Sequence, residues 1–97
     1  MKIPYKFSSK PWFHSGTGGW CFVSLPIELA KEIRQNVGKN EEGWGRLKII
    51  AKISTTEWKT AIWFDTKLNT YLLPLKAEVR KKEAILIDKD LEVTIWV

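Results

Sequence analysis

The sequence predicts a mainly β protein: a small β-barrel with a pseudo-two-fold axis and two short helices. The main observation is a repeated dipeptide, Leu25-Pro26 and Leu73-Pro74. Each copy follows a short apolar run typical of a β-strand and precedes a stretch with helical spacing. Each helical stretch then leads through a polar turn into another strand-like segment. Two copies of one strand–helix–strand unit favour an internally duplicated barrel.

Composition indicates one globular domain over residues 1–97, with 44% hydrophobic and 28% charged residues. Six Trp and four Phe supply large side chains for a small core. No apolar run approaches the roughly 20 residues that span a bilayer, and residues 1–6 lack the apolar region of a signal peptide. A single cysteine excludes an internal disulfide. We therefore expect a cytoplasmic protein with no membrane association.

The first part of the chain predicts two strands. Residues 3–8 read as a strand, with Pro4 near its start, where proline is tolerated. Residues 15–19 form a turn, because their glycines adopt positive φ at little cost. Residues 20–25 are nearly all apolar, so we expect a strand buried on both faces.

The next segment predicts a helix over residues 27–37. Pro26 suits the first helical position, Glu28 lies in the first turn where the helix dipole favours a carboxylate, and Gly38 suits the C-terminal cap. The apolar residues at helical spacing form the expected inward stripe: Ile27, Ala30, Ile33 and Val37.

Residues 46–53 alternate between apolar and mostly basic side chains, which predicts a strand with one buried and one charged face. Residues 54–57 form a turn into a strand over 58–64, giving a hairpin. After a turn at 65–69, a further strand is expected over 70–73.

Pro74 is expected to open the second helix, over about 75–82. Alternating apolar residues predict a final strand over 91–97. The apolar residues expected to face inward from the helix and the connector after it are Leu75, Val79, Ile85 and Ile87.

Three segments, Phe22–Pro26, Gly43–Lys48 and Leu73–Lys81, in this order resemble an uncharacterised prokaryotic family, a domain of unknown function. The resemblance covers roughly residues 7–97. That family is similar in fold to the double-split β-barrel of AbrB-type transition-state regulators, in which two chains each supply half of the barrel. The resemblance therefore implies a double-split barrel with both halves on one polypeptide. Lys89-Asp90 departs from the family pattern, which has Gly-Asp before the last strand.

The residues offer little for catalysis. His14 is the only histidine, so no catalytic triad or two-histidine metal site can form within one chain. Cys21 falls in a strand expected to be buried, where a packed thiol is inert. The glycines at 16–19 lack the Gly-Lys-Ser/Thr ending of a phosphate loop. We expect no enzyme activity, cofactor or metal.

Two features suggest a binding surface. The first is basic: Arg46, Lys48 and Lys52 share one strand face, while Lys76 and Arg80 are one helical turn apart. Such residues could contact the phosphates of a nucleic acid. They could instead form a solvated charged face, because basic strand faces also serve solubility and protect sheet edges.

The second feature is Trp44, which lies between two glycines just before Arg46. Its indole could stack on a ligand or base, or it could close one end of the barrel core. Alternation does not decide whether Trp12, Trp63 and Trp96 are core residues or half-exposed ones. An exposed pair would indicate an interaction patch.

The sequence thus favours a non-catalytic binding or interaction module, monomeric or weakly dimeric. The alternative is a nucleic-acid-binding regulator with an AbrB-like fold, which would use Arg46, Lys48, Lys52, Lys76 and Arg80 on phosphates. An enzyme is the least favoured class.

Overall fold

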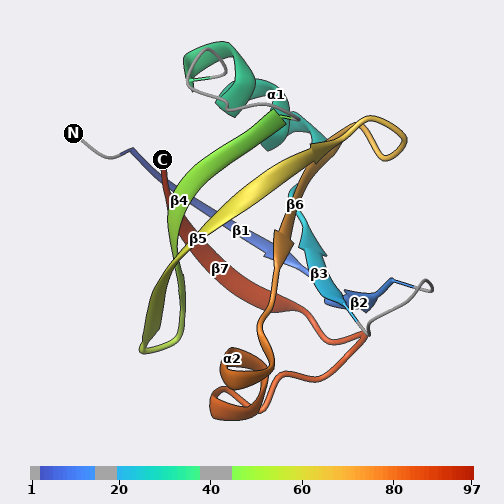
Figure 1. Cartoon of the computed structure of the whole chain (residues 1–97), viewed down its shortest axis with the longest axis vertical. Coiled ribbons are helices and arrows are strands. Elements are labelled where there is room, and N and C mark those ends of the chain that lie inside the picture. Colours follow the sequence, from blue (N-terminus) through green and yellow to red (C-terminus); the bar gives the residue numbers. More distant parts are fainter. Residues whose placement is uncertain (1–2, 15–19, 38–44) are drawn as a thin grey trace.

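The computed structural model describes residues 3–14, 20–37 and 45–97 (Figure 1). Its strands form one antiparallel sheet with the order β1-β7-β4-β5-β6-β3-β2. The strands and helices are β1 (Pro4–Ser9), β2 (Trp12–Phe13), β3 (Cys21–Ser24), α1 (Ile27–Val37), β4 (Arg46–Ile53), β5 (Thr56–Asp65), β6 (Thr70–Pro74), α2 (Ala77–Lys82) and β7 (Leu91–Trp96).

The sheet curls into a half-barrel, and its two edge strands are neighbours in the sequence. Lys10 and Pro11 alone separate β1 at one edge from β2 at the other. Pro11 has no backbone N–H to donate to a strand ladder, which suits a break between two strands. The prediction of a mainly β fold with two short helices is confirmed.

The core lies inside the curl of the sheet. It is built by the inward residues of alternating strands, and β4 shows the pattern clearly: Leu47, Ile49, Ala51 and Ile53 are buried, whereas Lys48 and Lys52 are exposed. The strand predicted over 46–53 and its two unlike faces are therefore confirmed. Other core residues come from most of the remaining elements: Tyr5, Phe7, Cys21, Val23, Ile62, Tyr71, Leu73, Val79, Val93 and Ile95.

The two helices lie at opposite ends of the curled sheet, α1 at the top of Figure 1 and α2 at the bottom. Helix α1 begins and ends as predicted and buries Ala30, Ile33 and Val37. Ile27 was expected in the same stripe but is 46% exposed. It is the first residue of the helix and follows the exposed Pro26, so it lies outside the contact with the sheet. Among the described residues, neither helix is long and apolar enough to cross a membrane.

Both prolines take positions other than the predicted ones. The Pro26 carbonyl accepts the first helical bond from the Ala30 N–H at 3.0 Å, so Pro26 caps α1 from outside its first turn. Pro74 is the last residue of β6, and α2 begins only at Ala77. The second helix is thus shorter than the predicted 75–82.

The strands β3 and β6 are nevertheless related by a regular repeat. The Leu25 N–H donates to the Tyr71 carbonyl at 3.0 Å, and the Leu75 N–H donates to the Cys21 carbonyl at 2.9 Å. Residue 75 stands 50 positions after residue 25, and residue 71 stands 50 after residue 21. The helices begin at Ile27 and Ala77, with the same offset. Leu25-Pro26 therefore corresponds to Leu75-Lys76, not to Leu73-Pro74.

Two local predictions were wrong at strand ends. The hairpin turn is Ser54-Thr55, because Ile53 already pairs with Thr56. The strand predicted over 20–25 is not buried on both faces. Trp20 precedes β3 and is 53% exposed, and Phe22 is half-buried. Only the side of β3 that carries Cys21 and Val23 faces the core, and the other side, which carries Phe22, faces out of the curled sheet.

Candidate functional site

Three of the predicted basic residues line one groove on the outside of the sheet. Arg46 and Lys48 reach it from β4, and Lys76 reaches it from the residue before α2. Lys59 of β5 also lines this groove, although the sequence did not single it out. The groove has a volume of about 580 Å³, and no Asp or Glu is among the described residues that line it. We call it the basic groove, lined by Arg46, Lys48, Ile49, Ile50, Lys59, Thr60, Ala61, Trp63, Lys76, Trp96 and Val97.

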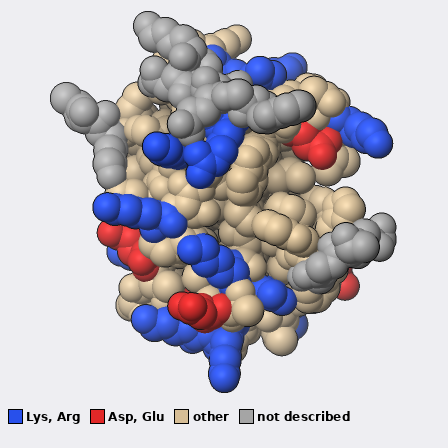
Figure 2. All heavy atoms as spheres, in the orientation of Figure 1, with Lys and Arg blue, Asp and Glu red and all other residues tan. Residues whose placement is uncertain are grey.

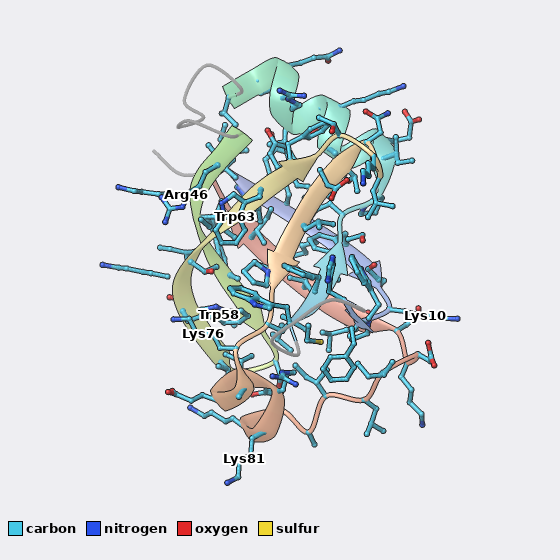
Figure 3. The ribbon with its side chains drawn as sticks, turned by 45° about the vertical axis from the view of Figure 1, so that its right-hand side comes forward. Lys10, Arg46, Trp58, Trp63, Lys76 and Lys81 are labelled. Atoms are coloured by element: carbon cyan, nitrogen blue, oxygen red, sulfur yellow. The ribbon has the colours of Figure 1, made fainter. Side chains whose placement is uncertain are left out.

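The strand register explains this gathering of charge. Residues directly opposite each other in an antiparallel pair point to the same face. Arg46 is opposite Trp63, and Ile50 is opposite Lys59, so the outward residues of β4 and β5 form one surface. Figure 3 shows Arg46, Trp63 and Lys76 along the same side of the molecule, with Lys10 on the opposite side. On the face shown in Figure 2, basic side chains are more numerous than acidic ones.

The remaining predicted site residues lie elsewhere. Lys52 lines a second hollow of about 600 Å³ together with Lys6 and Glu92, and its cross-strand neighbour is Glu57. This hollow therefore has mixed charge. Trp44 lies outside the described residues.

Arg80 lies on α2 and makes contacts within the protein. Its Nε donates to the Leu75 carbonyl at 3.2 Å, and its guanidinium carbon lies 5.4 Å from the centre of the Phe13 ring. Lys76 and Arg80 share a small hollow of about 160 Å³ beside Trp20. The predicted one-turn spacing thus brings them together, but Arg80 lies outside the basic groove.

A cluster of rings lies beside the basic groove. Trp12 of β2 is opposite Phe22 of β3, with ring centres 5.4 Å apart. Trp20 stacks on Phe22 at 6.0 Å with an angle of 12° between the ring planes. The His14 ring meets Phe22 edge-on at 6.4 Å. Together with Trp63, three of these rings, His14, Trp20 and Phe22, line a hollow of about 400 Å³, which we call the aromatic hollow.

The sheet register also sets the position of this cluster. On one face, Trp63 is opposite Leu72, and Leu72 is opposite Ser24. The Trp12 indole N–H donates to Ser24 Oγ at 2.9 Å, which ties β2 to the same face. The outward face therefore runs from β4 across β5, β6 and β3 to β2. Trp12 and Trp63 are half-buried, which answers a question that the alternation of the sequence left open.

Trp63 joins the two hollows, because it lines both of them. Its ring lies 6.0 Å from the guanidinium carbon of Arg46. The basic groove and the aromatic hollow thus form one continuous surface, which we call the aromatic–basic surface. The high Trp content of the sequence pointed to such a surface. The pairing of β5 with both β4 and β6 was needed to place Trp63 in it.

One comparison identifies the family. A family model described as a domain of unknown function, DUF1905, matches residues 7–95 of the chain. The chain belongs to the DUF1905 family. This confirms the resemblance to an uncharacterised domain family, and the match includes every residue of the aromatic–basic surface except Trp96 and Val97. No curated protein matches the chain significantly.

The single cysteine of this DUF1905 chain lies in the core. Cys21 is 2% exposed, which confirms the prediction that it is buried. Burial raises the pKa of its thiol, and the nearby Arg80 charge lowers that pKa to a smaller extent. A thiol held protonated is a weak nucleophile. Within the described segments, no three His, Cys, Asp or Glu side chains are grouped so as to hold a metal ion.

Proposed function

We propose that this DUF1905 protein is a non-catalytic binding module whose ligand is a nucleic acid. The observation that carries the proposal is the basic groove, where Arg46, Lys48, Lys59 and Lys76 converge from two strands and the start of a helix. Each cation can meet a phosphate of one extended backbone. The net charge of +5 would also attract a polyanion from a distance.

The absence of carboxylates from the described lining of the groove favours an anionic ligand over a solvated surface. A face that serves only solubility usually mixes both signs of charge. The hollow around Lys52 does so, because Glu92 lies in it. The basic groove differs from that hollow in the same protein.

We also infer that the curled sheet is a double-split barrel related to AbrB-type regulators. The chain runs through the order strand, strand, helix, strand twice, counting β1 and β2 as one interrupted strand. The 50-residue offset between the β3 and β6 hydrogen bonds supports two equivalent halves. We therefore propose, more specifically, that the protein is a regulator that acts on DNA in the cytoplasm. It rests on the fold analogy with AbrB-type regulators.

Binding to labelled oligonucleotides over a range of salt concentrations tests the proposal. We expect affinity to fall as salt rises, because each neutralised phosphate releases counterions. Replacing one groove lysine, as in Lys48→Ala or Lys59→Ala, should weaken binding to all sequences and reduce the salt slope by about 1.

The matched control is Lys10→Ala, which removes the same charge from the opposite side of the molecule (Figure 3). It should leave the salt slope close to that of the wild type. Equal effects of Lys48→Ala and Lys10→Ala would mean that net charge alone attracts the nucleic acid. If neither single-stranded nor duplex oligonucleotides bind at low salt, the proposed function is wrong.

A further inference from the structure

We propose that this protein binds nucleic acid as a single strand, with unpaired bases stacked on the aromatic hollow and the backbone held in the basic groove. This inference rests on the proposed function and specifies its ligand. It depends on the exposure of the rings and on their continuity with the basic groove.

The rings form a stacking platform that the fold does not cover. Trp20 is 53% exposed, although most large apolar side chains of the described residues are buried. Trp20 lies nearly parallel to Phe22, so the pair presents a flat apolar surface. Flat rings accept any base, because every base has an aromatic face.

The neighbouring charge selects the class of ligand. An exposed apolar platform alone would also suit a protein partner. Here Trp63 forms a wall of both the aromatic hollow and the basic groove, and Arg46 lies 6.0 Å from its ring. One ligand that spans both hollows must combine flat apolar groups with negative charges. A single-stranded nucleic acid has both along its whole length.

Duplex nucleic acid fits this surface less well. In a duplex the faces of the bases are stacked on one another, so only the terminal pairs could reach Trp20 and Phe22. The phosphates remain available, and the basic groove could still contact them. The structure therefore predicts a preference for single strands that depends on the aromatic hollow, on top of a salt-dependent affinity for both forms.

Trp20→Ala separates the two contributions. Because Trp20 is exposed, the variant should fold, which circular dichroism and thermal unfolding can verify. We expect its affinity for an unstructured oligothymidine to fall between about 5-fold and about 150-fold, the usual effect of losing one stacked base. Its affinity for a duplex of equal length should stay within about 2-fold of the wild type, since phosphate contacts are unchanged.

Two further variants complete the test. Trp20→Phe keeps a flat ring and should recover most of the single-strand affinity. Leu68→Ala removes another exposed apolar side chain, 47% exposed in the β5–β6 turn, and should have no effect. A mononucleotide should compete only weakly with the oligothymidine, because it cannot span the two hollows.

The outcomes distinguish the inference from the proposed function. If neither form of DNA binds, the proposed function fails and the inference fails with it. If both forms bind and Trp20→Ala weakens neither or both equally, the inference alone is wrong and the basic groove remains a duplex or general polyanion site. Competition by a mononucleotide as strong as that of the oligothymidine would also overturn single-strand binding.

Discussion

Cys21 lies on the inward face of β3, between the exposed Trp20 and the half-buried Phe22 in the sequence. The alternation of a strand turns neighbouring side chains to opposite faces, so three consecutive residues meet different environments. For Cys21 the environment is the core, which disfavours the thiolate and raises its pKa above the ordinary value of 9.0. The thiol is thus protonated at neutral pH.

This pKa shift predicts a pH dependence of stability. In the unfolded chain the thiol ionises near 9.0, whereas in the folded protein it stays protonated to a higher pH. Its stabilising effect is therefore complete below the unfolded pKa and is lost as the pH rises through the folded pKa. Between about pH 7.5 and about pH 10, the free energy of unfolding should fall more in the wild type than in Cys21→Ala. Urea unfolding at the two pH values measures this, and an equal fall in both proteins would contradict it.

Single side chains were only partly predictable. The burial of Cys21 was anticipated from its strand, and the contrast between Leu47 and Lys48 follows from alternation alone. The exposure of Trp20 was not anticipated, because an apolar side chain in a strand-like run suggests burial. Whether an aromatic ring is covered depends on which other elements reach it, and such contacts are not local in the sequence.

Among the elements, α1 shows how a helix is fixed by one stripe of residues. It buries Ala30, Ile33 and Val37, and Ile33 is fully buried at 0% exposure. It begins directly after Pro26, a local signal that is readable in the sequence. Gly38, the expected C-terminal cap, lies outside the described residues. The second helix is only six residues long and has no side-chain cap at Lys76.

A matched pair of substitutions on α1 tests this description. Ile33→Ala should lower the free energy of unfolding by about 2–5 kcal/mol, because it leaves a cavity in the core. Ile27→Ala makes the same chemical change at a position that is 46% exposed, so its effect should stay within about 0.5 kcal/mol. Denaturant unfolding of both variants measures the difference. Similar losses in the two would mean that Ile27 packs against the core after all.

The repeat of Leu-Pro illustrates the limits of reading elements from sequence. It pointed to the correct strands and helices, but its spacing of 48 residues differs from the structural offset of 50. Proline is compatible with both the residue before a helix and the end of a strand. Hydrogen bonds between β3 and β6 decide which position each proline takes. These bonds join residues that are far apart in the sequence.

At the scale of the whole molecule, the pairing of β3 with β6 and of β4 with β7 takes place within one chain. In the AbrB-type regulators of our proposed fold analogy, two chains supply the two halves. The single chain already joins its first and second halves through these pairings. We therefore expect a monomer.

Sedimentation analysis over a range of protein concentrations checks the oligomeric state. The mass should stay at about 11.3 kDa in the absence of nucleic acid. A mass that rises gradually with concentration would indicate a weak dimer. A constant mass of twice this value would contradict the expectation.

The sequence by itself determined the class of fold, the strand over 46–53, the helix over 27–37 and the family, because alternation, helical spacing and motif order are local properties of the chain. The tertiary structure decided which charges act together. Lys59 and Lys76 join Arg46 and Lys48 because β5 pairs with β4 and because α2 starts beside them. Lys52, further along the same face of β4, lines the hollow of mixed charge, and Arg80 contacts Leu75 and Phe13. It also decided that Trp63 connects the basic groove to the aromatic hollow, since a surface made from five strands exists only when long-range pairing has set their register.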